Sequence, residues 1–291
     1  MTGTVPDLMR AAYIDSVGPA DHIHHGWLPV PSIGPTDVLV SVAAVAVDPV
    51  DTFVRSGAYA TPLPLPFVVG RDLVGEVALA GAGAVGFTPG QRVWCDSLGH
   101  AGRQGSFAQY ATVPAERLYT VPRDIDEEHL VAAAHPAASA WLALFRHGRL
   151  RPGETVYIGG GAGNVGGAAV AMASRAGARV HLDTSGHGVL ADAVDLLARG
   201  GRLVAMVGLG TGPAELPLSR LYTKDAGIVG FAISNATTAD LAEAAGGVVS
   251  VLRDTPWRPR IADRLPLSMT AQAHRRLEAG EVRGRLILTP S

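Results

Sequence analysis

The stretch Thr155–Gly166, which reads TVYIGGGAGNVG, decides the fold. Thr155–Ile158 is a short β-branched and aromatic run that leads directly into glycines and then into an Ala-rich helical stretch. Gly161, Gly163 and Gly166 take the Gly-x-Gly-x-x-Gly spacing: the first permits a tight turn, the second lets the backbone approach a pyrophosphate, and the third lets helix and strand pack closely. We therefore expect a strand–turn–helix that holds a dinucleotide at the helix N-terminus, with a ligand-free glycine-rich turn as the alternative.

The segments around this motif alternate between short β-branched runs and Ala-rich helical stretches, which predicts an open parallel sheet. The β-branched runs are Thr155–Gly159, Arg179–Leu182, Arg202–Gly208 and Gly227–Ile233, and the helical stretches are Val131–Arg146 and Gly167–Ala176. The first third is instead rich in apolar bursts separated by Gly and Pro, which is typical of a β-barrel. The tail returns to that texture with an amphipathic helix, Pro266–Ala279, and a final strand, Arg285–Leu288.

We therefore expect an α/β protein of two domains, in which a Rossmann-type parallel sheet domain, residues 125–256, is inserted into a β-barrel domain formed by residues 1–124 and 257–291. The 291 residues include 47% hydrophobic and 17% charged residues, so the chain can bury a core and is not disordered. A net charge of −2 offers no basic surface for nucleic acid.

Two further features bear on location and metal chemistry. No apolar run reaches the roughly 18 residues that span a bilayer, and residues 1–10 lack signal-peptide character, so we expect a soluble cytoplasmic protein without membrane contact. One cysteine, Cys95, allows no intrachain disulfide and no cysteine-rich zinc site. His22, His24 and His25 have no acidic or cysteine ligand at suitable spacing, so we expect no metal there.

The second half of the nucleotide motif departs from the usual pattern. Asp183 lies about 20 residues beyond the glycines, where an acidic residue takes the adenosine ribose hydroxyls, and read literally this predicts NAD. However, only 42 residues separate Gly166 from Gly208, whereas a doubly wound domain passing through five strands needs roughly 75–85 residues there. The sequence therefore predicts a truncated sheet.

Several motifs, in order along nearly the whole chain, resemble one known family. These are the stretches Ala46–Tyr59, Gly70–Gly75, Pro89–Trp94, Gly105–Tyr110, the glycine motif, Gly200–Val204 and Arg283–Leu288. They resemble the zinc-free quinone oxidoreductase, or zeta-crystallin-like, branch of the medium-chain dehydrogenase/reductases. The resemblance implies a GroES-like barrel domain with an inserted Rossmann domain, NADPH as hydride donor, a quinone or activated alkene (enone or enoyl) as acceptor, and a homodimer paired through the last Rossmann strand.

The resemblance also implies the site residues. Asp48, Tyr59 and Arg71 are the catalytic candidates. Gly70-Arg71-Asp72 stands where zinc-dependent relatives have Gly-His-Glu, so metal-assisted alcohol oxidation is not expected. The candidates for cofactor binding are Ser139, Gly161, Ala162, Gly163, Asn164, Val165, Gly166, Gly208, Phe231 and Arg285.

Two departures from the family pattern leave alternatives open. Asp48 replaces the usual Asn; its carboxylate would disfavour negative charge nearby, unless burial raises its pKa enough to make it a proton donor. Arg179–His181 resembles the start of the family's second Rossmann strand and Leu182–Gly186 the end of its fourth, so the two are fused unless Asp183 binds ribose. On the fused reading, contacts to a 2′-phosphate are missing, and the cofactor affinity drops from micromolar towards millimolar.

Three functions follow from these alternatives. The first is a zinc-independent reductase that uses NADPH, or NADH if Asp183 binds the ribose. The second is a cofactor-independent cyclase, dehydratase or isomerase that uses Asp48, Tyr59, Arg71 or His135 on a reductase scaffold that no longer binds a dinucleotide. The third is a binding protein without activity.

Overall fold

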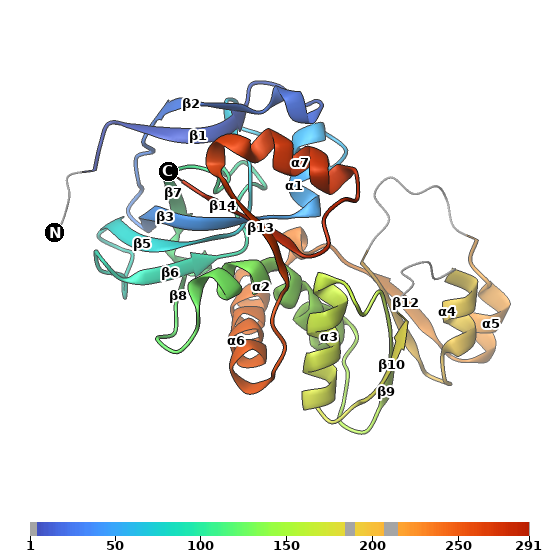
Figure 1. Ribbon diagram of the computed structural model, residues 1–291. Helices are drawn as coiled ribbons and strands as arrows, with labels where there is room; N and C mark the ends of the chain where they lie inside the picture. The colour runs from blue at the N-terminus through green and yellow to red at the C-terminus, as the bar shows by residue number, and fades with distance from the viewer. Residues whose placement is uncertain (1–4, 184–189, 207–214, 291) are drawn as a thin grey trace. The chain divides into compact units, whose positions relative to one another are not determined.

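The computed structural model describes residues 5–183, 190–206 and 215–290, with only the backbone for 180–183 (Figure 1). The chain forms two compact units, one of residues 1–135 and 258–291 and the other of residues 136–257. The first boundary falls inside a helix, eleven residues beyond the expected one, because that helix begins in one unit and ends in the other. In the part of the chain that is described, no helix is long and apolar enough to cross a membrane.

The first unit is built on two sheets. The larger has seven strands in the order β13-β14-β3-β5-β6-β8, with β7 also paired to β3, and the smaller has the order β2-β1-β4. The strands are β1 (Leu8–Ile14), β2 (His24–Pro29), β3 (Asp37–Val47), β4 (Phe67–Val68), β5 (Leu73–Ala80), β6 (Arg92–Cys95), β7 (Tyr110–Pro114), β8 (Tyr119–Thr120), β13 (Ile261–Pro266) and β14 (Arg285–Thr289). Among the residues described, these sheets do not close into a barrel, so the expected barrel is an open arrangement of two sheets.

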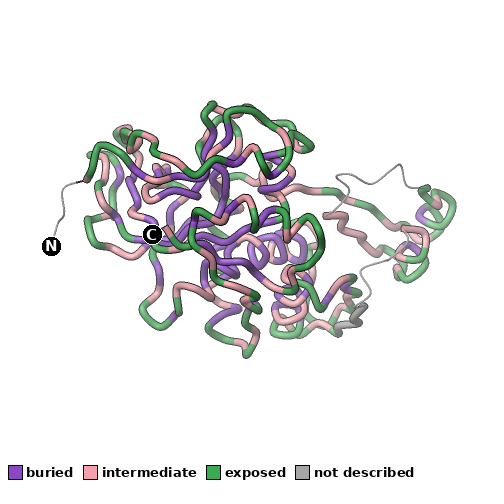
Figure 2. The backbone as a smooth tube through the Cα atoms, turned by 45° about the horizontal axis from the view of Figure 1, so that its top comes forward, coloured by how far each residue is buried: buried purple, intermediate pink, exposed green. Residues whose placement is uncertain are grey.

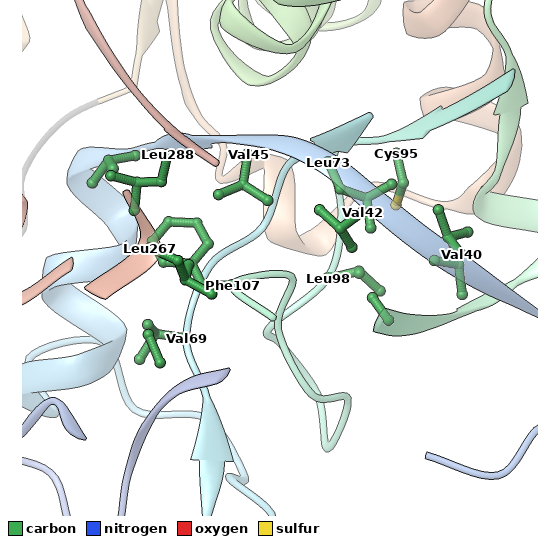
Figure 3. Packing of buried hydrophobic residues seen from close by; sticks show 14 of the residues in the cluster. Val40, Val42, Val45, Val69, Leu73, Cys95, Leu98, Phe107, Leu267 and Leu288 are labelled. Carbon is green, nitrogen blue, oxygen red and sulfur yellow. The ribbon is translucent and has the colours of Figure 1, made fainter. Parts of the chain in front are cut away.

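The eleven-residue strand β3 organises this unit because it pairs with β5, β7 and β14. Its run DVLVSVAAVAV is β-branched at alternating positions, which favours a strand with one face against the core. Val40, Val42 and Val45 of β3 pack with Leu73, Phe107 and Leu288 in one apolar cluster (Figure 3). Figure 2 shows buried backbone through much of this unit. The cluster therefore fixes the ends of β3, β5 and β14, where the polar residues described below lie.

Two helices complete the first unit, and a third begins in it. Helix α1 (Pro49–Ser56) follows β3 directly: Pro49 occupies its first turn, where a missing N–H costs nothing, and Gly57 ends it with a φ of 84°. Helix α7 (Thr270–Glu278) precedes β14 and packs against α1. Helix α2 (Glu127–Trp141) starts in this unit and ends in the second.

The second unit contains two separate pairs of parallel strands. Strand β9 (Thr155–Gly159) pairs with β10 (Arg179–Asp183), and β11 (Arg202–Ala205) pairs with β12 (Gly227–Gly230). Its helices are α3 (Asn164–Arg175), α4 (Leu190–Leu196), α5 (Leu218–Thr223) and α6 (Thr238–Asp254). The parallel α/β arrangement predicted for this region is confirmed, but the described strands form two pairs and not one continuous sheet.

Candidate active site

The ends of three neighbouring strands bring a buried polar cluster together in the first unit. Asp48 follows β3, Asp72 precedes β5, and Arg285 begins β14; β3 pairs with both β5 and β14. Arg285 Nη1 lies 2.7 Å from Asp48 Oδ1, and Nη2 lies 3.6 Å from an Asp72 carboxylate oxygen. The three side chains are at most 2% exposed. Sheet pairing thus places one guanidinium between two carboxyl groups that are 24 residues apart in the sequence.

The two carboxyl groups of this cluster hold protons differently. Burial alone would raise the pKa of Asp48, but the positive charge of Arg285 and its hydrogen bond lower it below its ordinary value. Burial, followed by the negative charge of Asp48, raises the pKa of Asp72 well above its ordinary value. At neutral pH, Asp48 is therefore a carboxylate paired with Arg285, whereas Asp72 holds its proton to a higher pH than an ordinary carboxyl group does. Of the two roles left open for Asp48, the structure favours the charged one.

A histidine completes the cluster. The His135 backbone N–H donates to Asp72 Oδ2 at 3.3 Å, and burial lowers the pKa of the His135 side chain to about 4. Ligand atoms of Asp48, Asp72 and His135 lie within 4.8 Å of one another, so their donor set could in principle ligate a cation. Arg285 already supplies positive charge to both carboxyl groups, and a metal ion would have to displace it. The cluster therefore fits a guanidinium better than a divalent metal.

Two of the predicted catalytic residues, Tyr59 and Arg71, lie near His100. The partly buried Tyr59 ring stacks on His100 at a centroid distance of 5.6 Å and an interplanar angle of 18°. The Arg71 side chain is 2% exposed, and its charge lowers the pKa of both His100 and Asp96. Burial raises the pKa of Asp96 to about 7 despite that charge. His100 and Asp96 were not predicted from the sequence, which has no spacing signal that links them to Tyr59.

The predicted nucleotide motif forms a turn and helix in the second unit. Gly160, with a φ of 68°, makes the tight turn that was expected at Gly161. Gly163 is the N-cap of α3, and a Cβ at Gly166 would collide with the Gly160 carbonyl and Gly161. Only glycine at 166 therefore lets the helix start so close to the strand. Ala162 and Gly163 are exposed where α3 begins, and the first turn of a helix leaves its N–H groups without intrahelical partners.

The first turn of α3 fits the pyrophosphate of a dinucleotide. Asn164, Val165 and Gly166 form the first turn of α3, which has twelve residues and carries a partial positive charge at this end. No acidic side chain lies in that turn. The loop thus has the close backbone approach, the helix N-terminus and the absence of acidic charge that a pyrophosphate requires.

The other predicted cofactor residues lie in different places. Ser139 is buried in α2, and the Phe231 ring stacks on His147 at 4.4 Å. Arg285 belongs to the buried cluster of the first unit, whereas the glycine loop belongs to the second. Gly208 and the side chain of Asp183 lie outside the described residues. The Asp183 backbone pairs with Gly159. This pairing agrees both with a fused second and fourth strand and with a second strand whose Asp183 binds ribose.

Two family models match most of the chain. The model described as "Alcohol dehydrogenase GroES-like domain" matches residues 34–123, and the one described as "Zinc-binding dehydrogenase" matches residues 166–288. The chain belongs to the medium-chain dehydrogenase/reductase superfamily. This confirms the resemblance and the α/β fold with a GroES-like and a Rossmann-like region.

Individual members of this superfamily cover the chain. The quinone oxidoreductase of Lama guanicoe is 27% identical, and the alignment covers 97% of each chain. A mycobacterial protein whose structure was solved in complex with NADPH is 25% identical, with a TM-score of 0.80 over 97% of this chain and all of that one. A 2-haloacrylate reductase from a Burkholderia species is 33% identical over 60% of this chain and 52% of its own length.

The alignment with the Lama guanicoe protein bears on the shortened region. It spans 327 positions yet contains 97% of a chain of only 291 residues. The relative therefore has residues at tens of positions where this medium-chain dehydrogenase/reductase has none. This agrees with the short distance between Gly166 and Gly208 in the sequence.

Proposed function

We propose that this protein is a zinc-independent, NAD(P)H-dependent reductase that transfers hydride to a quinone or to an activated alkene of the enone or enoyl type. The superfamily supports an oxidoreductase that uses a nicotinamide dinucleotide. The single observation that carries the proposal is the loop before α3, where Gly166 permits a contact that any Cβ would prevent. The similar proteins named for quinone and haloacrylate reduction support the choice of acceptor.

Side chains of the protein would supply the proton that this reaction needs. A bound nicotinamide supplies a hydride to an electron-poor carbon, and the resulting anion then needs a proton. Tyr59 is partly exposed and offers a phenol, while burial and the charge of Asp48 raise the pKa of Asp72 well above its ordinary value. Arg71 and Arg285 supply positive charge near these groups. We assign Tyr59 as the proton donor.

Zinc independence rests on the same cluster. A catalytic zinc ion requires about three protein ligands and an open position, and here Arg285 is placed against two of the three candidate ligands. The cationic role of a metal is therefore taken by guanidinium groups. Dialysis against a chelator should leave the reductase activity unchanged, and a loss of activity restored by Zn²⁺ would contradict this part of the proposal.

Cofactor binding provides the main test. Titration of the protein with NADPH and with NADH, followed by nicotinamide fluorescence, should saturate below about 100 micromolar for at least one of them, the scale expected of a functional site. Oxidation of that cofactor should then depend on an added quinone or enone. The absence of binding at millimolar concentrations of both would overturn the proposal.

A cofactor-independent enzyme is the second candidate, and one observation favours it. The described strands of the second unit form two separate pairs, whereas a dinucleotide ordinarily lies across a continuous sheet. Under this candidate, Asp72 and Tyr59 would move protons in an isomerisation or dehydration without hydride transfer. Turnover of an enone in the absence of any nucleotide would distinguish it from the reductase.

We also propose a homodimer. Strand β12 is paired with β11 on one side only among the described strands, so its other edge can accept a second copy. Light scattering coupled to size-exclusion chromatography would test this, and a monomer at micromolar concentration would contradict it.

A further inference from the structure

Two arginines in the first unit lack an acidic partner. Among the residues that the structure describes, neither Arg103 nor Arg117 forms an ion pair within 4 Å, whereas other arginines of this unit, such as Arg55 and Arg92, do. Both guanidinium groups are half-buried and are directed at one residue, Ser97. Arg103 Nη2 lies 3.4 Å from the Ser97 carbonyl oxygen, and Arg117 Nη1 lies 3.4 Å from its hydroxyl. These are long, weak hydrogen bonds that a stronger acceptor would replace.

The local charge balance is positive. Burial, and then the charges of Arg117 and Arg71, lower the pKa of Arg103, as expected where like charges are close. The acids nearby are the exposed Glu116 and the buried Asp96, whose pKa of about 7 leaves it only partly ionised at neutral pH. Arg103 and Arg117 thus have less than their equivalent of negative charge nearby. Half-buried charges in this state are costly unless an anion joins them.

Arg103 lies close in the chain to His100, whose ring contacts the predicted catalytic residue Tyr59. The Arg103 backbone N–H donates to the His100 carbonyl at 3.2 Å, so these two residues share one tight turn. The His100 ring stacks on Tyr59, and its pKa is lowered by burial and then by Arg71, Arg103 and Arg117. His100 therefore lies beside both the Tyr59 phenol and the arginines. A ligand bound by these arginines would therefore lie next to His100, the residue whose ring stacks on Tyr59.

We infer that Arg103 and Arg117 bind an acidic group of the acceptor, and that the acceptor is an electrophilic alkene that carries a carboxylate. A carboxylate matches the planar fork of arginine and brings a single charge, which suits a cluster where Asp96 already supplies part of one. This inference rests on the proposed reductase function. In the reaction, hydride from the nicotinamide adds to the alkene carbon β to the carbonyl, and a proton adds to the α carbon of the resulting enolate, so the C=C bond becomes a single bond while the nicotinamide is oxidised.

Binding without a cofactor tests the acid site independently of the reductase activity. The probes are 4-oxopentanoate, which cannot be reduced at an alkene, and its methyl ester, measured by isothermal titration calorimetry. The acid should bind at least about tenfold more tightly than the ester, as expected for one or two charge-assisted hydrogen bonds. Arg103→Gln and Arg117→Gln should each remove this preference. Arg123→Gln, which changes an exposed arginine of the same unit, should keep it.

Several outcomes would overturn the inference: equal binding of acid and ester, a preference that survives in both variants, or tighter binding of inorganic phosphate than of the acid. Thermal melting of each variant checks that it is folded, and the second arginine variant provides an independent test if the first is not.

Turnover adds a second measurement, with 4-oxopent-2-enoate and its methyl ester as acceptors and NADPH or NADH as donor. Arg103→Gln should lower the acid-to-ester ratio of kcat/KM about tenfold through a higher KM for the acid, and Arg123→Gln should leave the ratio unchanged. If neither acceptor is reduced while 4-oxopentanoate still binds through the arginines, the reductase function is overturned and the acid site is supported.

Discussion

The strands of the two units differ sharply in burial. In the first unit, most residues of β3, β6 and β14 and half of those of β5 are buried, and a charged cluster lies at the ends of β3, β5 and β14. In the second unit, Ile158 is the only buried residue among the described side chains of β9, β11 and β12. Tyr157 and Ile228 of these strands are 44% and 37% exposed. Strands of a complete doubly wound sheet are covered by helices on both faces and read as fully buried.

This difference in burial shows that the shortening of the sequence affects the second unit. The first unit contains the strands β3, β5 and β14, whose ends bring Asp48, Asp72 and Arg285 together. The second unit keeps the glycine loop and α3, while its buried residues come mainly from α2, α3 and α6. The second unit therefore combines a glycine loop and helix N-terminus that fit a pyrophosphate with two short strand pairs beside them.

The largest effect is expected in the first unit, from Arg285→Met. This change leaves the Asp48 carboxylate buried without its cationic partner, which should lower the free energy of unfolding by about 3–5 kcal/mol. Urea unfolding followed by tryptophan fluorescence measures it. Arg199→Met removes an exposed ion pair with Asp225 and should cost less than about 1 kcal/mol. Equal losses in the two variants would contradict the structural role of Arg285.

The second unit should be most sensitive at its glycine loop. Gly166→Ala forces a Cβ against the Gly160 carbonyl, which should cost about 1–3 kcal/mol in stability. It should also weaken NADPH binding by about tenfold or more, because the helix N-terminus moves away from the pyrophosphate. Fluorescence titration of the cofactor and urea unfolding measure the two effects. Unchanged affinity would show that this loop does not hold the cofactor.

The buried acids of the first unit should make its stability depend on pH. Burial, followed by the charge of Asp48, raises the pKa of Asp51 to about 8, so the folded protein keeps a proton that the unfolded chain has released above its ordinary pKa of 3.8. This contribution is fully present below pH 3.8 and is lost as the pH rises towards 8. Asp51→Asn keeps a neutral acceptor for the Asp48 backbone N–H and abolishes the dependence.

The free energies of unfolding of wild type and Asp51→Asn, measured from pH 4 to 8, should therefore diverge in favour of the variant. The upper limit is about 1.4 kcal/mol per pH unit. The exposed Asp7→Asn serves as the control and should follow wild type. Parallel curves for wild type and Asp51→Asn would show that Asp51 is ionised in the folded protein.

The smallest change in stability is expected from substitutions at two adjacent glycines of α6, Gly246 and Gly247. A Cβ at Gly246 would meet nothing within 4 Å, so Gly246→Ala should stabilise the second unit by about 0.5–1 kcal/mol through helix propensity. A Cβ at Gly247 would collide with the Trp141 ring, so Gly247→Ala should destabilise it. Melting temperatures of the two variants should shift in opposite directions. A shift in the same direction would mean that Trp141 does not pack on α6 as the structure has it.

The sequence alone predicted the fold and part of the site. The glycine spacing from Gly161 to Gly166 fixed a strand, a turn and a helix, because close backbone approach leaves no other residue type at Gly166. The short distance to Gly208 predicted the reduced sheet, since chain length limits the number of strands. The family motifs predicted both regions and named Asp48, Tyr59 and Arg71 as catalytic candidates; their roles remain predictions.

Only the tertiary structure decided which charges meet. Arg285, a candidate for cofactor binding from the resemblance, pairs with Asp48, because β14 lies antiparallel to β3 and brings residues more than 200 positions apart to one strand end. The protonation of Asp72 depends on burial and on Asp48, which no local spacing encodes. Local sequence thus determined turns and helix starts, where the constraint lies within a few residues. The electrostatics of the site arise from pairing between distant strands, and only the folded chain specifies them.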